Sequence, residues 1–84
     1  MSRAAKLYAQ LLANPNAIIS FADFRALFAA FGFAERRGKG SHRNYKHLKV
    51  PAILTAQPRG KDAVPYQVKR LLAVVKEYDL HIAE

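Results

Sequence analysis

The stretch from Ser20 to Gly32 carries a start signal and a stop signal for a helix, with a strongly apolar sequence between them. Ser20 is a favourable N-cap residue, and Asp23 fits a capping box with aspartate in place of the commoner glutamate. Gly32 suits the left-handed position that ends many helices. One face of the expected helix is apolar and mostly aromatic, and consists of Phe21, Phe24, Leu27, Phe28 and Phe31. Such a face is stable only against a second layer of structure, so this helix requires a packing partner.

From residue 33 onward the pattern changes from helical to extended. Residues Phe33–Arg37 are expected to form a short strand, and the two glycines of Gly38-Lys39-Gly40 permit a tight connection. The returning strand is expected at Ser41–His47, and a third strand at Lys49–Ala56. Residues 57–62 are expected to form a loop, because they contain Pro, Gly and charged side chains.

Two further helices complete the pattern. Residues 2–13 have apolar side chains at helical spacing, and Asn14-Pro15 ends that helix. A last helix is expected at Pro65–Tyr78, since proline suits the first helical turn. Without the first helix the chain is an α+β protein of α-β-β-β-α order, with a three-stranded antiparallel sheet and helices on one face. We expect residues 1–15 to form an extra N-terminal helix and residues 16–84 a single domain whose second sheet face is open to a ligand.

The charge balance favours a polyanionic partner. There are 14 Lys and Arg against 6 Asp and Glu, a formal net charge of +8 on 84 residues. An anionic membrane surface, an acidic protein or a merely solvated basic surface would satisfy the same balance. The absence of cysteine excludes disulfides and thiolate metal sites. No apolar run approaches the about 20 residues of a membrane span, so we expect no membrane partner and a cytoplasmic location.

Positive charge is concentrated in the predicted hairpin. Within fourteen residues, and with no acid between them, stand Arg36, Arg37, Lys39, Arg43, Lys46 and Lys49. Successive side chains of a strand alternate between two faces. One face would carry His42, Asn44 and Lys46. The other would carry Arg43, Tyr45 and His47. Such a segment can bind phosphates with its cations and can offer rings for stacking, although a tyrosine here is more typical of sheet packing.

One histidine has a setting suited to chemistry. His42 follows the glycine-rich turn among cations, and imidazole can act as a general acid or base near neutral pH. Cleavage of an RNA phosphodiester needs proton transfer and positive charge beside the phosphoryl oxygens, and the 2′-hydroxyl can be the nucleophile without a metal. The three histidines lack a metal-ligand spacing, and we expect no metal and no cofactor. Spacing alone still favours a surface histidine in a basic strand over a catalytic one.

A set of short motifs resembles the HicA toxins of bacterial HicA–HicB toxin–antitoxin systems. The first group of motifs is Gly32-Phe33, Lys39-Gly40-Ser41-His42 and Tyr45. The second group, similar to one HicA subgroup, is Gln57, Gly60-Lys61 and Pro65-Tyr66-Gln67-Val68. The resemblance covers roughly residues 20 to 80.

The resemblance implies a fold like the double-stranded RNA-binding domain and metal-independent cleavage of messenger RNA. It also implies that His42 is the catalytic residue and that a HicB-like antitoxin covers it, with operator DNA bound only indirectly through the antitoxin. In this interpretation Gly40 permits the turn, and Ser41 orients the backbone or the scissile phosphate. The residues expected to hold RNA are Arg36, Arg37, Lys39, Arg43 and Lys46.

Two other functions compete with the toxin. A non-catalytic RNA-binding module of the same fold would use the basic strand and the sheet without needing His42. A DNA-binding regulator would place a helix in the major groove. The helix after Ser20 is poorly suited to that task, because Arg25 is its only basic residue.

Overall fold

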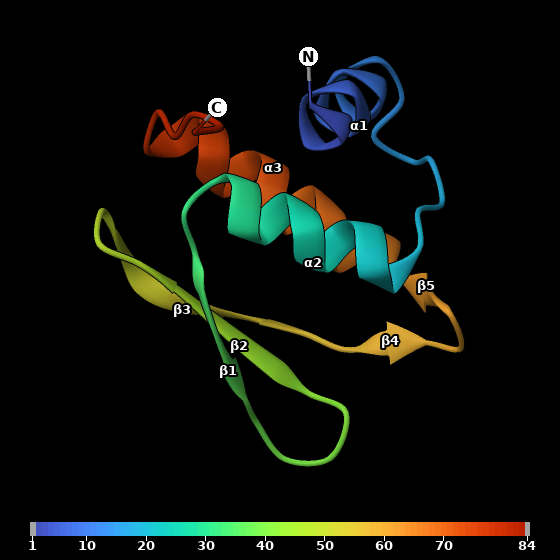
Figure 1. Cartoon of the computed structure of the whole chain (residues 1–84), viewed down its shortest axis with the longest axis vertical. Helices are drawn as coiled ribbons and strands as arrows, with labels where there is room; N and C mark the ends of the chain where they lie inside the picture. Colours follow the sequence, from blue (N-terminus) through green and yellow to red (C-terminus); the bar gives the residue numbers. More distant parts are fainter. Residues whose placement is uncertain (1, 84) are drawn as a thin grey trace.

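The computed structural model describes residues 2–83 and has an α+β fold, as predicted (Figure 1). In chain order the elements are α1 (Arg3–Ala13), α2 (Phe21–Ala30), β1 (Ala34–Arg37), β2 (Arg43–His47), β3 (Val50–Ala56), β4 (Pro58–Arg59), β5 (Asp62–Ala63) and α3 (Pro65–Glu77). Figure 1 shows the helices on one side of the sheet, with α1 farthest from it. The loop of the β1–β2 hairpin lies at the opposite end of the view from α1.

Strands β1, β2 and β3 form an antiparallel sheet in that order. Tyr45 in the centre of β2 lies between Glu35 on β1 and Leu54 on β3. The register shifts between Tyr45 and His47, which marks a β-bulge near the far end of β2. Helix α2 contacts β1 and α3 contacts β3, so both cover the same face. The prediction of a three-stranded sheet with one covered and one open face is confirmed.

The core is built on the aromatic face of α2. Phe24, Leu27 and Phe28 are buried, and Ser20 caps the helix by accepting a hydrogen bond from the Asp23 N–H at 3.0 Å. The Phe28 ring stacks on Tyr45 with ring centres 3.7 Å apart and planes within 1° of parallel. This contact joins α2 to the middle strand and therefore holds the β1–β2 hairpin against the helices.

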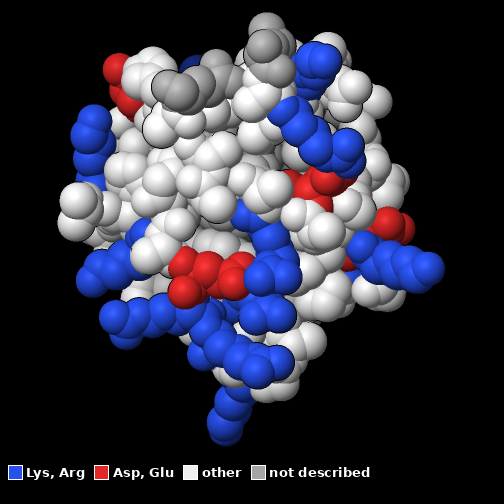
Figure 2. Space-filling model, in the orientation of Figure 1, with Lys and Arg blue, Asp and Glu red and all other residues white. Residues whose placement is uncertain are grey.

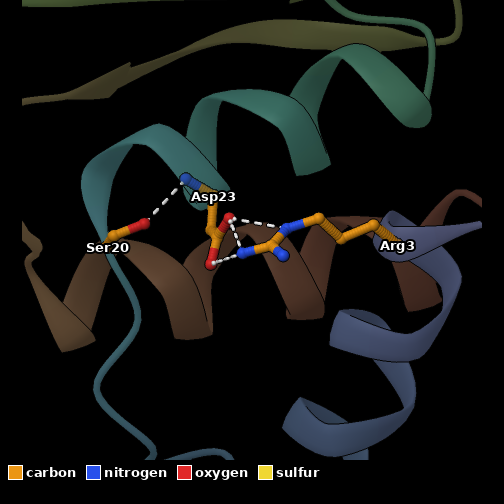
Figure 3. Close-up of polar contacts among 3 residues, drawn as sticks. All are labelled: Arg3, Ser20 and Asp23. Atoms are coloured by element: carbon orange, nitrogen blue, oxygen red, sulfur yellow. Dashed lines mark hydrogen bonds and ion pairs between the residues drawn. The ribbon is translucent and has the colours of Figure 1, made fainter.

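Helix α1 completes the core from the other side of α2. Leu11 is fully buried, and the edge of Tyr8 packs on the ring of Phe31 with centres 5.1 Å apart. Figure 3 shows that Arg3 also reaches across to Asp23, whose carboxylate accepts hydrogen bonds of 3.0–3.2 Å from Nε and Nη2. Arg3 is mostly exposed, so this ion pair adds about 1 kcal/mol at most. The apolar contacts are the main reason that α1 stays docked.

Several boundaries differ from the sequence prediction, and α1, β1 and β3 each begin one residue later than expected. Residues 57–62 are not only a loop: β4 and β5 pair there as a short hairpin. It is held by the chain entering α2, through hydrogen bonds from Phe21 N to Lys61 O and from Ala63 N to Ile19 O, which are contacts distant in sequence. Strand β2 begins at Arg43 rather than at residue 41, because the preceding residues form the turn. Helix α3 ends one residue earlier than expected.

Candidate RNA-cleaving site at the hairpin tip

The loop between β1 and β2 is a tight, hydrogen-bonded turn. Gly38 N–H donates to the His42 carbonyl at 2.9 Å, and His42 N–H donates to the Lys39 carbonyl at 3.0 Å. Gly40, the second residue of this turn, has a φ of +59°, which an L side chain adopts only with strain. The predicted role of Gly40 in permitting the turn agrees with this geometry. Ser41 is exposed beside it.

The ring of His42 is oriented by its own turn. Its Nδ1 lies 3.0 Å from the Lys39 carbonyl oxygen. Because a carbonyl oxygen only accepts hydrogen bonds, Nδ1 carries the proton in this contact. In the neutral imidazole Nε2 is then the basic nitrogen, which is the arrangement that a general base requires. The His42 side chain is exposed, so a substrate can reach it.

The predicted RNA-binding cations divide between the two faces of the hairpin. Arg36 pairs with Asn44, and Lys46 lies two residues farther along β2, so both share the open face with His42. Arg37 on β1 and Arg43 on β2 lie directly opposite each other. Both are on the same face of the sheet as Tyr45, which faces the helices. Lys39 is exposed in the turn itself. Figure 2 shows Lys and Arg side chains gathered around the end of the molecule where the hairpin lies.

Arg37 and Arg43 lie directly opposite each other, and the Glu35 carboxylate attracts Arg43. Two like charges directly opposite each other on neighbouring strands repel. Arg43 Nε is also buried and has no hydrogen-bond partner among residues 2–83. An anion at the accessible ends of the two guanidinium groups would offset the repulsion between them. This side of the hairpin therefore carries two neighbouring cations near the turn that holds His42.

An ion-pair network that the sequence analysis missed fixes the base of the hairpin. Arg25 of α2 binds both carboxylate oxygens of Glu35 at 2.9 Å, and the Tyr45 hydroxyl donates to Glu35 at 2.6 Å. The hydrogen bonds from Arg25 and then from Tyr45 lower the pKa of Glu35 from 4.5 to about 2. Burial, followed by the bond to Glu35, raises the pKa of Tyr45. Since Arg25 is engaged here, α2 has no free cation for a DNA groove.

Acid is expected to weaken the fold partly through Glu35. Its folded pKa lies below its ordinary value, so its charged form contributes stability above about pH 5, and this is lost as the pH falls toward about 2. Between about pH 6 and pH 3, the wild-type protein should lose about 1 kcal/mol more of its free energy of unfolding than the Glu35→Gln protein loses. The difference is modest because Glu35 and Arg25 are partly exposed. Urea unfolding at the two pH values measures this. Glu77→Gln, at an exposed carboxylate, is the control, and an unchanged pH dependence in Glu35→Gln contradicts the assignment.

Other surfaces are less suited to this chemistry. A groove of about 570 Å³ lies between α1, α3 and the residues after α3, and no residue of the β1–β2 hairpin lines it. In the described part of the chain, no three His, Asp or Glu side chains gather as metal ligands. No helix within residues 2–83 is both long enough and apolar enough to cross a membrane.

Comparison with known protein families shows that the hairpin lies within a segment that matches one family model. The family model described as HicA toxin of bacterial toxin–antitoxin systems matches residues 21–76, which is two thirds of the chain. The match runs from the start of α2 almost to the end of α3 and leaves α1 outside. No curated protein matches the chain. No solved structure matches it either. The extent of the family match shows that this chain belongs to the HicA family of toxins of bacterial toxin–antitoxin systems.

Proposed function

We propose that this toxin is an endoribonuclease that cleaves messenger RNA and uses His42 as its proton-transfer residue. The observation that carries the proposal is the oriented His42 ring at the tip of a cation-rich hairpin. This hairpin lies within the segment that matches a family of toxins known to cleave messenger RNA.

The reaction follows from the groups at the tip. The 2′-oxygen of one nucleotide attacks the adjacent phosphorus, and the bond from phosphorus to the 5′-oxygen breaks. His42 Nε2 accepts the proton of the 2′-hydroxyl, water protonates the leaving 5′-oxygen, and the histidine later returns its proton to water. The products are a 2′,3′-cyclic phosphate and a 5′-hydroxyl. Lys39 and Arg36 would supply positive charge for the phosphoryl oxygens, and Ser41 would orient the backbone or the same phosphate.

The partner in this proposal is a HicB-like antitoxin that covers the hairpin tip. A toxin family of toxin–antitoxin systems implies such a partner in general terms. Arg37, Arg43 and Lys39, which form no salt bridge among residues 2–83, favour an acidic surface on it. Any contact with operator DNA would then be made by the antitoxin, because α2 presents no free cation.

Expression in bacteria without the antitoxin tests this function. We expect the wild-type chain to arrest growth and fragment messenger RNA, and His42→Ala at equal protein level to do neither. Equal arrest by both proteins, or intact RNA during the arrest, contradicts the proposal. If the wild-type protein binds RNA but leaves it intact, the protein is instead a non-catalytic RNA-binding module.

A further inference from the structure

The open face of the sheet continues the site away from the hairpin tip. Gly38 lies opposite His42, and the next row across the sheet is Arg36, Asn44 and Thr55. The row beyond it pairs Ala34 with Lys46. Directly opposite residues of antiparallel strands share a face, so these side chains form one surface that begins at His42.

Asn44 is held in a fixed orientation on this surface. Its Oδ1 accepts a hydrogen bond of 3.0 Å from the Thr55 hydroxyl. Its Nδ2 lies 3.2 Å from the point where a Cβ on Gly38 would stand, and the Cβ of His42 lies 3.4 Å from that same point. The amide and the histidine therefore both lie beside Gly38, where the lack of a side chain leaves them room. The amide nitrogen can donate a hydrogen bond to a ligand beside His42.

A shallow hollow lies immediately next to this amide. Its volume is about 120 Å³, and it is lined by Ala34, Arg36, Asn44, Tyr45, Lys46 and Ile53. Ile53 is 57 % exposed, so its apolar side chain is available to a ligand in the hollow. The hollow holds the liquid volume of about four waters, far below the ~300–1,000 Å³ of drug-sized ligand sites. It suits one small planar group with an apolar face.

We infer that this hollow is a nucleobase subsite for a nucleotide next to the cleaved bond. Ile53 and Ala34 would contact the face of the base, and the Asn44 amide would donate to its edge. Arg36 and Lys46 stand on the rim, where they would bind the phosphates on either side of that base. The inference rests on the proposed function, because it takes His42 as the position of the scissile phosphate.

The rim charges favour RNA over a protein side chain as the occupant. Two cations and an amide donor surround a small apolar floor, which matches a base between two phosphates. A protein contact of useful strength would need a much larger apolar area than this hollow offers. The competing outcome of the test is therefore that the antitoxin, and no RNA base, contacts this hollow.

Binding of short single-stranded RNAs to the His42→Ala protein tests the subsite without cleavage. RNAs are compared in which one base at a time is removed while the backbone stays intact. We expect removal of one particular base, adjacent to the site that the wild-type protein cuts, to weaken binding roughly fivefold or more. Adding Ile53→Ala or Asn44→Ala should reduce that effect to under about twofold. The control Leu48→Ala, at a fully exposed aliphatic residue that does not line the hollow, should leave it unchanged.

The outcomes separate this inference from the proposed function. If the wild-type protein cuts RNA but the base-removal effect is the same with and without Ile53→Ala, the subsite is wrong and the enzyme stands. If no RNA is cut, yet one base is sensed through Ile53 and Asn44, the subsite stands and the catalytic proposal fails. If Ile53→Ala changes only the affinity for the antitoxin, the hollow is a protein contact and the inference is overturned.

Discussion

Purified His42→Ala is expected to cleave RNA about 10²- to 10⁴-fold more slowly than the wild-type protein, the usual loss when a general acid or base is removed. The fold should survive, because the side chain is exposed and its one described side-chain hydrogen bond is to Lys39 within the same turn. The cations around the tip would still bind RNA. The loss should therefore appear in the rate of cleavage at saturating RNA, with little change in RNA affinity.

His81→Ala provides the control for this prediction. His81 is also exposed, lies beyond α3 and lines the groove between α1 and α3 instead of the hairpin. Its replacement should leave the cleavage rate within about twofold, as expected for a surface residue away from the site. A His42→Ala protein that cleaves as fast as His81→Ala would show that His42 is only a surface histidine.

Phe28→Ala is expected to destabilise the protein by about 3–5 kcal/mol, the range for deleting a buried phenylalanine ring. Phe28 is 2 % exposed and stacks on Tyr45, so its removal leaves a cavity between α2 and the middle strand. A domain of this size has little stability in reserve, typically about 5–15 kcal/mol. The variant should therefore be largely unfolded at urea concentrations that leave its parent native, and it should lose the anchor of the hairpin.

Urea unfolding in the His42→Ala background measures this effect without toxicity. Tyr66→Ala removes an aromatic ring that is 71 % exposed at the start of α3, and should change stability by less than about 0.5 kcal/mol. If Phe28→Ala and Tyr66→Ala lower the free energy of unfolding by similar amounts, the stacked rings of Phe28 and Tyr45 do not hold the hairpin to the helices.

Much of the fold could be predicted because its signals are local. Ser20 and Asp23 mark the start of α2, and the hydrogen bond from Asp23 N–H to Ser20 appears as expected. Pro65 begins α3, and Gly40 takes the left-handed conformation of the turn. Each of these residues acts within a few positions of itself, so its role can be read without knowing the tertiary structure.

The contacts that were missed all depend on register or on packing between distant segments. Glu35 looks like an isolated acid in the sequence, and only its pairing opposite Tyr45 brings it to Arg25. Counting back from the turn predicted at residues 38–40 would have placed Glu35 opposite Arg43, and its true partner Tyr45 follows only because the turn extends to His42. The β4–β5 hairpin had no local signal, because its support comes from the chain before α2.

The same limit applies to the candidate site. The alternation of β2 correctly placed Asn44 and Lys46 on one face, but it could not show which residues of β1 and β3 join them. The bond from Thr55 to Asn44 and the exposed Ile53 belong to the far strand. Their contribution to the surface beside His42 emerges only once the sheet is assembled.

Cleavage of an RNA that carries a single 2′-deoxyribose tests the central claim most directly. The deoxyribose replaces the ribose whose 2′-hydroxyl would attack, and EDTA is present throughout. The account predicts that the all-ribose RNA is cut to a 2′,3′-cyclic phosphate and a 5′-hydroxyl, and that the one deoxyribose blocks cutting at that bond. Cutting at the deoxyribose, or 5′-phosphate ends that disappear with EDTA, would contradict it.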